Sequence, residues 1–412
     1  MNYMNTLPYD VEAIRADFPI LSEPVRGKRL VYLDSAGSAQ KPQQVIEAVQ
    51  RVYGSEYSNV HRGLHYMSEQ TSARYEEARE KVRAFINAKH EHEVIFTKGT
   101  TESINMVASS FGDANVGLGD EVIITHAEHH SNIVPWQLLR DRTGCVLKVV
   151  PVDGHGSFKL SDFDELITKK TKIVAFCHVS NVLGTVLPVR EIADIAHAHG
   201  AVVVIDGAQG LVHMPVDMQA LDADFYVFSG HKLYAPSGVG VLYGKEALLE
   251  AMPPYQGGGG MINTVSFEKT TWADLPDKFE AGTPPIAQAI GLGVAIDYLS
   301  GVGMAAIAEH ERGLLNYATQ QLSAVEGLNF VGTATGKASV VSFTMDCAHP
   351  HDISTIIDQN GVAVRAGHHC AQPLMDRFDL PSTARASLGL YNTYEDIDIL
   401  AESLEKVREI FR

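Results

Sequence analysis

Lys232 is the residue whose surroundings most favour chemistry. It lies in SGHKLYAPSG, a turn between two strongly apolar runs, so we expect its side chain to be half-buried. Burial disfavours the charged ammonium and lowers the pKa of a lysine, which makes the amine nucleophilic enough to form a Schiff base. Ser229 and His231 flank it and could donate to a phosphate. The alternative is a surface lysine in a loop, which the apolar flanks make less attractive.

Two other apolar runs also end in polar residues. VVVIDGAQG places Asp206 at the end of a strand, with Gln209 just beyond it. A carboxylate there can pair with a protonated pyridine nitrogen, hold a metal, or cap a turn, which is the commonest fate of Asp before Gly. EVIFTKGTTES passes from a strand into a helix at Thr100 and Thr101. Free N–H groups and hydroxyls at that point could bind phosphate, or could only cap the helix.

Adjacent histidines occur at two places in the chain, and one of these pairs precedes a cysteine. EHHSNIVPW carries His129 and His130. Adjacent residues of an extended chain point to opposite sides, so this pair cannot easily share one metal. VRAGHHCAQP carries His368, His369 and Cys370 in a loop bounded by glycine and proline. Cys370 could be a zinc ligand, a buried structural thiol or a nucleophile, but adjacent His-His-Cys lacks the spacing of structural zinc sites.

Taken together, these groups are the parts needed to hold pyridoxal 5′-phosphate. A lysine forms the Schiff base with this cofactor, and an acidic partner keeps its pyridine nitrogen protonated. A helix N-terminus with threonine hydroxyls binds phosphate, and a flat imidazole can stack on the ring. The sequence therefore predicts a pyridoxal phosphate site and no metal site.

Composition sets the class of protein. The chain of 412 residues, 45% hydrophobic and 20% charged, is typical of a globular protein with two domains of ordinary size. A formal net charge of -17 disfavours nucleic acid as the main partner. Four cysteines without a CxxC favour a reducing compartment, and the N-terminal MNYMNTLPYD lacks the pattern of a signal peptide. No apolar run reaches the length of a membrane span. We therefore expect a cytoplasmic protein that binds neither nucleic acid nor membrane.

Short β-branched runs alternate with helical patterns through the first two thirds of the chain. This alternation predicts an α/β domain with a mostly parallel seven-stranded sheet. Ligands of such sheets bind where strands end and loops begin, which would bring the polar residues above together. The expected strands are Val94–Phe96, Glu121–Thr125, Val146–Val150, Ile173–Cys177, Val202–Ile205, Phe225–Phe228 and Val239–Tyr243.

We divide the chain into three parts. Residues 31–284 form the large cofactor-binding domain, in which QGGGG (256–260) reads as a mobile loop or hairpin. A long helical stretch after FEAGTPP begins a smaller α/β C-terminal domain, residues 285–412, with strands near Val340–Met345 and Val362–Arg365 and a C-terminal helix ending at Arg412. Residues 1–30, with a helix-like Val11–Phe18, form an N-terminal segment that packs on the small domain.

The wording and order of the motifs resemble a known family, the class V aminotransferase-like cysteine desulfurases, and within it the second group, the SUF-system type. The resemblance runs from LDSAGSAQKP near Leu33 to Tyr391, and implies a fold type I PLP-dependent transferase active as a homodimer. One departure is Gly37, where the family usually has alanine. The motifs are GTTESIN, EHHSNIVPW, VSNVLGT, DGAQG, SGHKLYAPSG, FEAGTP, RAGHHCAQPL and RASLGLYN.

The resemblance implies a role for each matching residue around the cofactor. Lys232 matches the Schiff-base lysine, and Asp206 matches the partner of the pyridinium nitrogen. Gln209 matches the donor near the phenolate oxygen, and His129 matches the ring-stacking residue. Phosphate-binding positions are matched by Thr101, Ser229 and His231 and, reaching across from the other subunit, by Thr283.

On the substrate side, the resemblance implies that L-cysteine is converted to L-alanine. Asn181 and Arg385 match substrate-site residues, and His61 lies in a segment similar to one near the substrate. A guanidinium fork suits the substrate carboxylate, and Lys232, once released, is the natural base for the Cα proton. Cys370 matches the cysteine that becomes a persulfide. Its loop is short, so we expect a SufE-like or SufU-like acceptor protein to collect the sulfur for iron–sulfur cluster assembly.

Three alternatives stay open at this stage. Selenocysteine lyase or cysteine sulfinate desulfinase could work on the same scaffold without Cys370. An ordinary aminotransferase would give that cysteine no function, and a non-catalytic zinc protein would need better-spaced ligands. The group that keeps Cys370 a thiolate is also open, with Arg365, His368 and His369 close in sequence.

Overall fold

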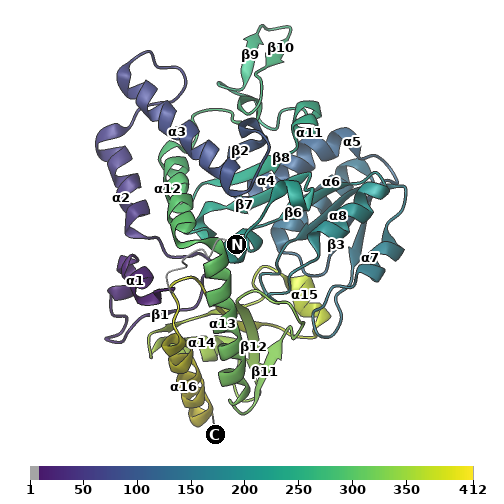
Figure 1. Cartoon of the computed structure of the whole chain (residues 1–412). Helices are drawn as coiled ribbons and strands as arrows, with labels where there is room; N and C mark the ends of the chain where they lie inside the picture. The colour runs from purple at the N-terminus through teal and green to yellow at the C-terminus, as the bar shows by residue number, and fades with distance from the viewer. Residues whose placement is uncertain (1–8, 412) are drawn as a thin grey trace, which may run out of the picture.

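A seven-stranded sheet organises the larger part of the chain (Figure 1). In the computed structural model, which describes residues 9–411, the strand order is β2-β8-β7-β6-β5-β3-β4. The pairs from β7 to β4 are parallel, and β8 runs antiparallel to both of its neighbours. The predicted mostly parallel seven-stranded sheet is thus confirmed, each strand within two residues of its expected bounds. The strands are β2 (Val94–Thr97), β3 (Glu121–Thr125), β4 (Val146–Val150), β5 (Thr171–Cys177), β6 (Val202–Asp206), β7 (Phe225–Ser229) and β8 (Gly240–Gly244).

Successive residues of these strands enter two different cores. In β6, Val203 and Ile205 face one core and Val204 faces the other, because side chains alternate across a strand. One face is covered by α3 (Tyr66–Phe85), α7 (Leu160–Leu166), α8 (Val189–Ala198) and α12 (Ile286–Val302). The other face is covered by α4 (Thr100–Met106), α6 (Val134–Thr143) and α11 (Glu246–Ala251). Coverage on both faces explains why the strands are almost wholly apolar.

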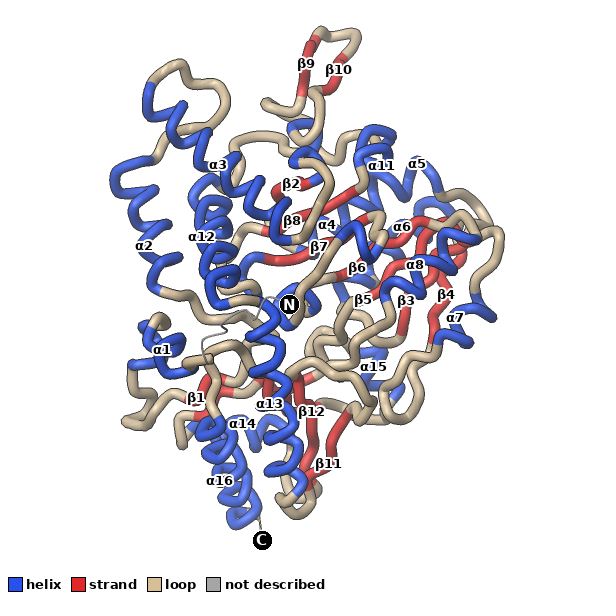
Figure 2. The backbone as a smooth tube through the Cα atoms, in the orientation of Figure 1, coloured by secondary structure: helices blue, strands red, loops and turns tan. Residues whose placement is uncertain are grey.

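A four-stranded antiparallel sheet forms the lower part of the molecule in Figure 2. Its order is β11-β12-β15-β14, with β11 (Leu328–Val331), β12 (Val340–Met345), β14 (Arg365–Gly367) and β15 (Thr383–Ser387). A third core lies between this sheet and α13 (Met304–Ser323), α14 (Pro350–Asp358) and α16 (Tyr394–Ile410). The remaining helices are α1 (Val11–Ala16), α2 (Gln43–Arg51), α5 (Asp113–Asn115), α9 (Gly210–His213), α10 (Met218–Leu221) and α15 (Gln372–Arg377).

The single strand expected at Val362–Arg365 is wrong. The chain leaves β13 (Val362–Ala363), which pairs in parallel with β1 (Val31–Tyr32), and enters β14 after Val364. One short segment, Val362–Gly367, therefore supplies strands to two sheets, which its local sequence does not reveal. The predicted strand at Val340–Met345 is confirmed.

The N-terminal helix α1 is bound to the C-terminal part of the chain. Arg15 donates to the carbonyl oxygen of Tyr391 and to the carboxylate of Asp396, each at 3.3 Å. The hydroxyl of Tyr9 donates to the carbonyl oxygen of Leu390 at 2.6 Å. Residues 1–8, which include most of the segment read for a signal sequence, and Arg412 lie outside the described residues.

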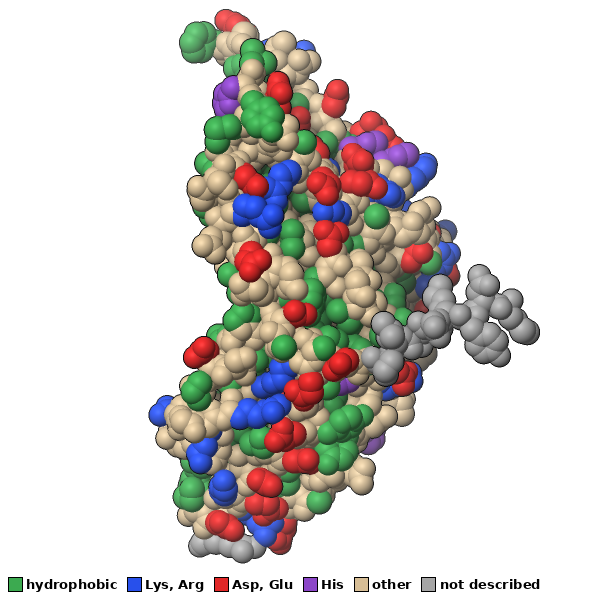
Figure 3. Space-filling view, turned by 60° about the vertical axis from the view of Figure 1, so that its left-hand side comes forward, with side chains coloured by type: hydrophobic (Ala, Val, Ile, Leu, Met, Phe, Trp, Pro, Cys, Tyr) green, Lys and Arg blue, Asp and Glu red, His purple; other side chains and the backbone are tan. Residues whose placement is uncertain are grey.

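A hairpin of β9 (Ile262–Val265) and β10 (Thr270–Trp272) projects from the upper end of the molecule. QGGGG itself has irregular backbone and leads into the hairpin. Figure 3 shows apolar side chains at this end. Within residues 9–411 no single helix is long and apolar enough to cross a membrane; α12 and α13 pass that test only as a pair, bent by 73°.

Candidate active site

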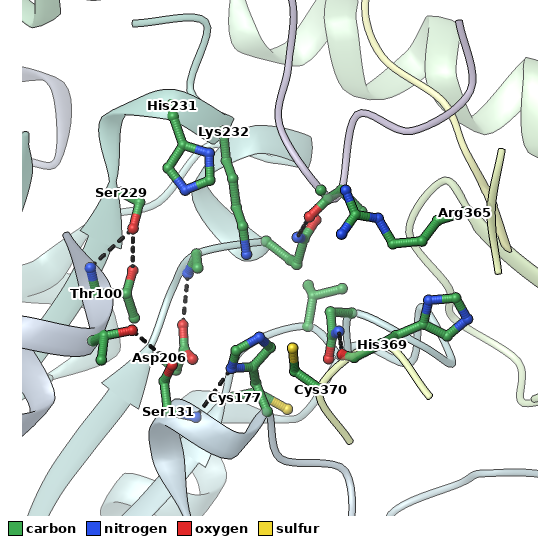
Figure 4. A pocket seen from close by; sticks show the side chains of 18 of the residues that line it. Thr100, Ser131, Cys177, Asp206, Ser229, His231, Lys232, Arg365, His369 and Cys370 are labelled. Atoms are coloured by element: carbon green, nitrogen blue, oxygen red, sulfur yellow. Dashed lines mark hydrogen bonds between the residues drawn. The ribbon is translucent and has the colours of Figure 1, made fainter. Parts of the chain in front are cut away.

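The polar ends of three neighbouring strands open into one pocket (Figure 4). Cys177 ends β5, Asp206 ends β6 and Ser229 ends β7, and all three line it. The pocket is a partly enclosed cavity of about 190 Å³ that opens to solvent. Every residue expected in the site lines this pocket except His61 and Thr283. Those brought together are Thr101, His129, Asn181, Asp206, Gln209, Ser229, His231, Lys232, Cys370 and Arg385.

Lys232 reaches this pocket from the 3₁₀ turn Gly230–Lys232, directly after β7. Lys232 is half-buried, as predicted from the apolar strands on either side. Burial lowers the pKa of Lys232, and the positive charge of Arg385 adds to this, while the carboxylate of Asp206 opposes it. A larger share of the amine is therefore unprotonated than for a surface lysine, which suits a nucleophile.

Asp206 faces Lys232 across the pocket (Figure 4). Burial raises the pKa of Asp206, whereas the charge of Lys232 and the backbone N–H of Ala208, which donates to Oδ1 at 3.0 Å, lower it. A buried carboxylate with so few donors is stabilised by a cation placed against it. The side-chain amide of Gln209 lies beside it and donates to the carbonyl oxygen of Ala36 at 2.9 Å.

A cup of hydroxyl and amide groups lies at the start of α4. Gly99 has φ +152°, and a Cβ there would lie 3.1 Å from Ser229 Oγ. The lack of a side chain lets Ser229 Oγ approach Thr100, whose N–H donates to it at 2.9 Å. Thr101 and Ser131 share a hydrogen bond between their hydroxyls at 2.7 Å. Sequence reasoning missed Ser131, although it directly follows the histidine pair.

His129 is held as a neutral ring. Its Nδ1 accepts the backbone N–H of Ser131 at 3.0 Å, which leaves the proton on Nε2. Burial, together with the charges of Lys232, His130 and Arg385, lowers the pKa of His129 to about 3. The rings of His129 and His130 are 6.4 Å apart and tilted by 56°, so they diverge. No group of three metal-binding side chains occurs among residues 9–411.

Arg385 forms the cationic end of the pocket and is 2% exposed. It donates to the carbonyl oxygen of Asn181 at 3.0 Å and to Asp34 Oδ1 at 3.2 Å, and its Nε has no partner. Burial lowers the pKa of Arg385 to about 10, so it stays cationic at neutral pH. Arg365 also binds Asp34, with Nη2 to Oδ2 at 2.8 Å. Asp34 lies in the motif LDSAGSAQKP, but its pairing with the two arginines was not predicted, because they are more than 300 residues away.

Gly37 matters for the position of Arg365. A Cβ at residue 37 would lie 2.5 Å from Arg365 Nη2 and 2.8 Å from Asp34 Oδ1. The glycine seen as a departure from the family pattern thus makes room for the ion pair of Arg365 with Asp34.

Cys370 enters the pocket from an exposed turn between β14 and α15. His369 and Cys370 both have left-handed backbone, with φ of 51° and 56°, which costs on the order of 1 kcal/mol or more each for residues with a Cβ. The side-chain amide of Asn181 donates to the carbonyl oxygen of His369 at 2.8 Å. Burial lowers the pKa of His369 to about 3, so it is neutral and cannot be the cation beside Cys370.

His61 and Thr283 lie outside this pocket. They line a second one, where His61 Nε2 is 2.8 Å from Glu76 Oε1 and this hydrogen bond raises the pKa of His61. In the described chain neither residue reaches Lys232. Their expected roles stay predictions, and that of Thr283 requires a second subunit.

The pocket fits pyridoxal 5′-phosphate, and the fit rests on its chain groups. Asp206 is a buried carboxylate without a cation in hydrogen-bond contact, as the partner of a pyridinium nitrogen must be. The cup at Thr100, Thr101 and Ser229 offers hydroxyls and a helix N-terminus to a phosphate. Lys232 lines the same pocket and would form the Schiff base with the cofactor's aldehyde group.

Comparison with known proteins identifies a family. The aminotransferase class-V family profile matches residues 31–400. A probable cysteine desulfurase of Halalkalibacterium halodurans is 53% identical over 398 residues, which cover 97% of this chain and 98% of that protein. A cysteine desulfurase of Escherichia coli is 49% identical over 405 residues, covering 98% and 100%. The resemblance read from the motifs is confirmed.

Two solved structures share the fold over nearly their whole length. The cysteine desulfurase CsdA (S-sulfonic acid) from Escherichia coli superposes with a TM-score of 0.92 at 40% identity, covering 98% of this chain and 100% of that one. The apo cysteine desulfurase from Thermococcus onnurineus gives a TM-score of 0.92 at 37% identity, covering 99% of each. The predicted fold type I architecture is therefore confirmed.

Proposed function

The chain belongs to the aminotransferase class-V family, and from this we propose that it is a pyridoxal phosphate-dependent cysteine desulfurase that holds sulfur as a persulfide on Cys370. The observation that carries the proposal is the meeting of Lys232, Asp206 and Cys370 in one pocket. An ordinary aminotransferase needs the first two groups and has no use for the third.

The cofactor, when bound, supplies an electron sink for the bond cleavages at Cα and Cβ of the substrate. Asp206 holds a proton on the ring nitrogen, which that role requires. His129, neutral through the physiological range, offers its flat face to the ring. Thr101 and Ser229 of the cup, together with His231, would anchor the phosphate. Lys232 first holds the cofactor and then moves the Cα proton.

Arg385 binds the carboxylate of L-cysteine. Its Nε has no protein partner, and Nη1 and Nη2 each make one hydrogen bond, which leaves N–H groups free to bind a carboxylate. Asn181 fixes Arg385 through its carbonyl oxygen and fixes the Cys370 turn through its amide. One residue therefore sets the distance between the substrate carboxylate and the attacking thiol.

The thiolate of Cys370 then attacks the substrate sulfur. The Cβ–S bond breaks with its electron pair left on Cβ, which takes up a proton, and the new S–S bond leaves Cys370 as a persulfide. The overall change is L-cysteine plus enzyme thiol giving L-alanine plus enzyme persulfide, which balances without an oxidant. Arg365 and Arg385 both line the pocket with Cys370 and supply positive charge near it.

A homodimer completes the site in this proposal. Thr283 lies outside the pocket that Lys232 lines. Large apolar side chains are exposed elsewhere on the subunit, including Leu64 at 98% and Phe267 in the turn between β9 and β10. Apolar surface of this kind is typical of subunit interfaces.

The exposed, short Cys370 turn favours delivery of sulfur to a SufE-like or SufU-like acceptor for iron–sulfur cluster assembly. Four free cysteines suit the reducing cytoplasm.

Alanine release from L-cysteine tests the proposal. The wild type and Cys370→Ser are compared, each with and without a candidate acceptor protein. We expect wild-type release that rises with the acceptor, and a loss of at least tenfold in Cys370→Ser with the cofactor absorbance retained, since the nucleophile is removed. Equal release by Cys370→Ser contradicts the proposal. Release confined to selenocysteine or cysteine sulfinate points to the alternative activities.

A further inference from the structure

The two histidines of EHH serve different parts of the site. His129 lines the cofactor pocket, whereas the ring of His130 turns toward the Cys370 loop and lies 6.1 Å from the ring of His368. The roles proposed so far use only His129. His130 is half-buried, and its contacts with the loop are specific.

His130 brackets Cys370 on both sides. Its backbone N–H donates to the carbonyl oxygen of Cys370 at 2.7 Å. Its ring Nε2 accepts the backbone N–H of Gln372 at 3.0 Å. Gln372 begins α15, so its N–H has no acceptor within that helix and needs one from outside. The ring of His130 therefore fixes the start of α15 and the loop that precedes it.

The ring must be neutral to do this, with its proton on Nδ1, because an imidazolium has no acceptor nitrogen. Burial lowers the pKa of His130, and the charge of His368 adds to this. The neutral form that accepts from Gln372 is thus the form favoured by its surroundings.

The backbone around Cys370 needs such support. Left-handed residues with a Cβ persist only when their surroundings hold them, and His369 and Cys370 are two in succession. Asn181 and Thr383 hold the His369 side of the turn, through the His369 carbonyl oxygen and the His369 ring. His130 holds the other side, at Cys370 and Gln372.

We propose that His130 is a positioning residue that places the Cys370 thiol against the substrate sulfur. Because His129 and His130 are adjacent, one short segment contacts the cofactor with one ring and the nucleophile's loop with the next. The position of Cys370 is then tied directly to the position of the cofactor ring. This inference rests on the proposed desulfurase function and adds the residue that sets the reach of its nucleophile.

Two substitutions separate the ring acceptor from the bulk of the side chain. His130→Phe keeps a flat ring and the backbone N–H but removes the acceptor. His130→Gln places an amide oxygen near the position of Nε2 and restores it. Since His130 is half-buried rather than a core residue, we expect both variants to fold.

Hydrogen exchange of the segment 364–374 gives the structural readout. In the cofactor-loaded His130→Phe protein, we expect the amide of Gln372 to exchange about five- to tenfold faster, the equivalent of one lost hydrogen bond. His130→Gln should keep wild-type protection. Unchanged exchange in His130→Phe would overturn the proposal.

The kinetic readout is the single-turnover rate of alanine formation from L-cysteine. We expect about a tenfold or greater loss in His130→Phe, because small displacements of a nucleophile cost this much. The cofactor absorbance of the variant should match that of wild type, and so should the L-cysteine concentration at which this absorbance changes. The reason is that His130 does not line the pocket that holds the cofactor and the substrate. His130→Gln should recover most of the rate.

The outcomes distinguish this inference from the function it rests on. If the wild type makes no alanine from L-cysteine, the proposed function fails. The exchange experiment still tests whether the ring of His130 holds the N–H of Gln372. If the wild type is active and His130→Phe has the same single-turnover rate, only the positioning role of His130 is wrong. A rate lost equally in His130→Phe and His130→Gln also contradicts the assignment to the ring acceptor.

Discussion

Asp34 and Arg385 form an ion pair at the wall of the pocket, with the carboxylate Oδ1 3.2 Å from the guanidinium Nη2; of the two, Arg385 lines the pocket. Asp34 also binds Arg365, so one carboxylate holds two arginines. The trio keeps one uncompensated positive charge, which matches the single carboxylate of an amino acid substrate. Arg385 lines the pocket and has unused N–H groups, so we place that carboxylate against its guanidinium.

Replacing Arg385 by lysine should therefore weaken substrate binding. A lysine keeps the charge but loses the planar fork that engages Asp34, Asn181 and the substrate together. We expect KM for L-cysteine to rise about 10- to 100-fold with a smaller change in kcat, the mark of lost uniform binding. Steady-state kinetics measure this, and a KM equal to that of wild type would show that the carboxylate binds elsewhere.

Gly37→Ala should displace Arg365 with little effect on the fold. The new Cβ would lie 2.5 Å from Nη2, at the flexible end of a half-exposed side chain that can move. An exposed ion pair contributes at most about 1 kcal/mol, so Tm should change by only a few degrees. We expect KM for L-cysteine to change by about threefold or less, because the free energy of the lost ion pair allows no larger effect on binding. A large loss of Tm would mean that residue 37 meets something more rigid than Arg365.

The low pKa of His129 predicts a loss of stability in acid. The folded protein keeps this ring neutral down to about pH 3, whereas the unfolded chain takes up a proton near its ordinary value of 6.5. The stabilising contribution is fully present above pH 6.5. It falls as the pH drops from 6.5 toward 3, because the unfolded state then binds more protons.

His129→Phe keeps a flat ring that does not titrate and is the matched control for this effect. Thermal unfolding of the cofactor-loaded proteins between pH 7 and pH 4 should show a shallower fall of Tm in the variant than in wild type. Parallel curves for the two proteins would mean that His129 is not held neutral by the fold.

Thr283→Val tests the contribution of a second subunit. The hydroxyl lies outside the pocket of its own chain, so a loss of cofactor affinity in this variant requires a partner. We expect the dissociation constant for pyridoxal phosphate to rise about fivefold, the equivalent of one hydrogen bond, with an unchanged dimer in sedimentation. A monomeric wild type, or unaltered affinity in the variant, contradicts the role proposed for Thr283.

Much of the large sheet was predictable because burial on both faces makes each strand a short, continuous apolar run. The residues that follow those runs, Lys232 and Asp206, could be recognised because strand ends of one sheet meet at one edge. The break at Val364 was not predictable, because no turn residue lies between Val362 and Arg365 to mark the change from one sheet to the other.

The cationic end of the pocket shows the limit of local patterns. Asp34, Asn181 and Arg385 come from segments separated by more than 100 residues, and only the packing of the two sheets brings them together. The choice among cations near Cys370 depended equally on geometry. His369 adjoins Cys370 in sequence, but its burial keeps it neutral, whereas Arg365 and Arg385 carry the charge.

The most direct test of the central claim is mass spectrometry of the peptide that contains Cys370 after a single turnover with L-cysteine and no acceptor. The account predicts one added sulfur atom on Cys370 in the wild type, in proportion to the alanine released, and none in Lys232→Ala. Alanine released without sulfur on Cys370, or sulfur found instead on Cys145, Cys177 or Cys347, would contradict it.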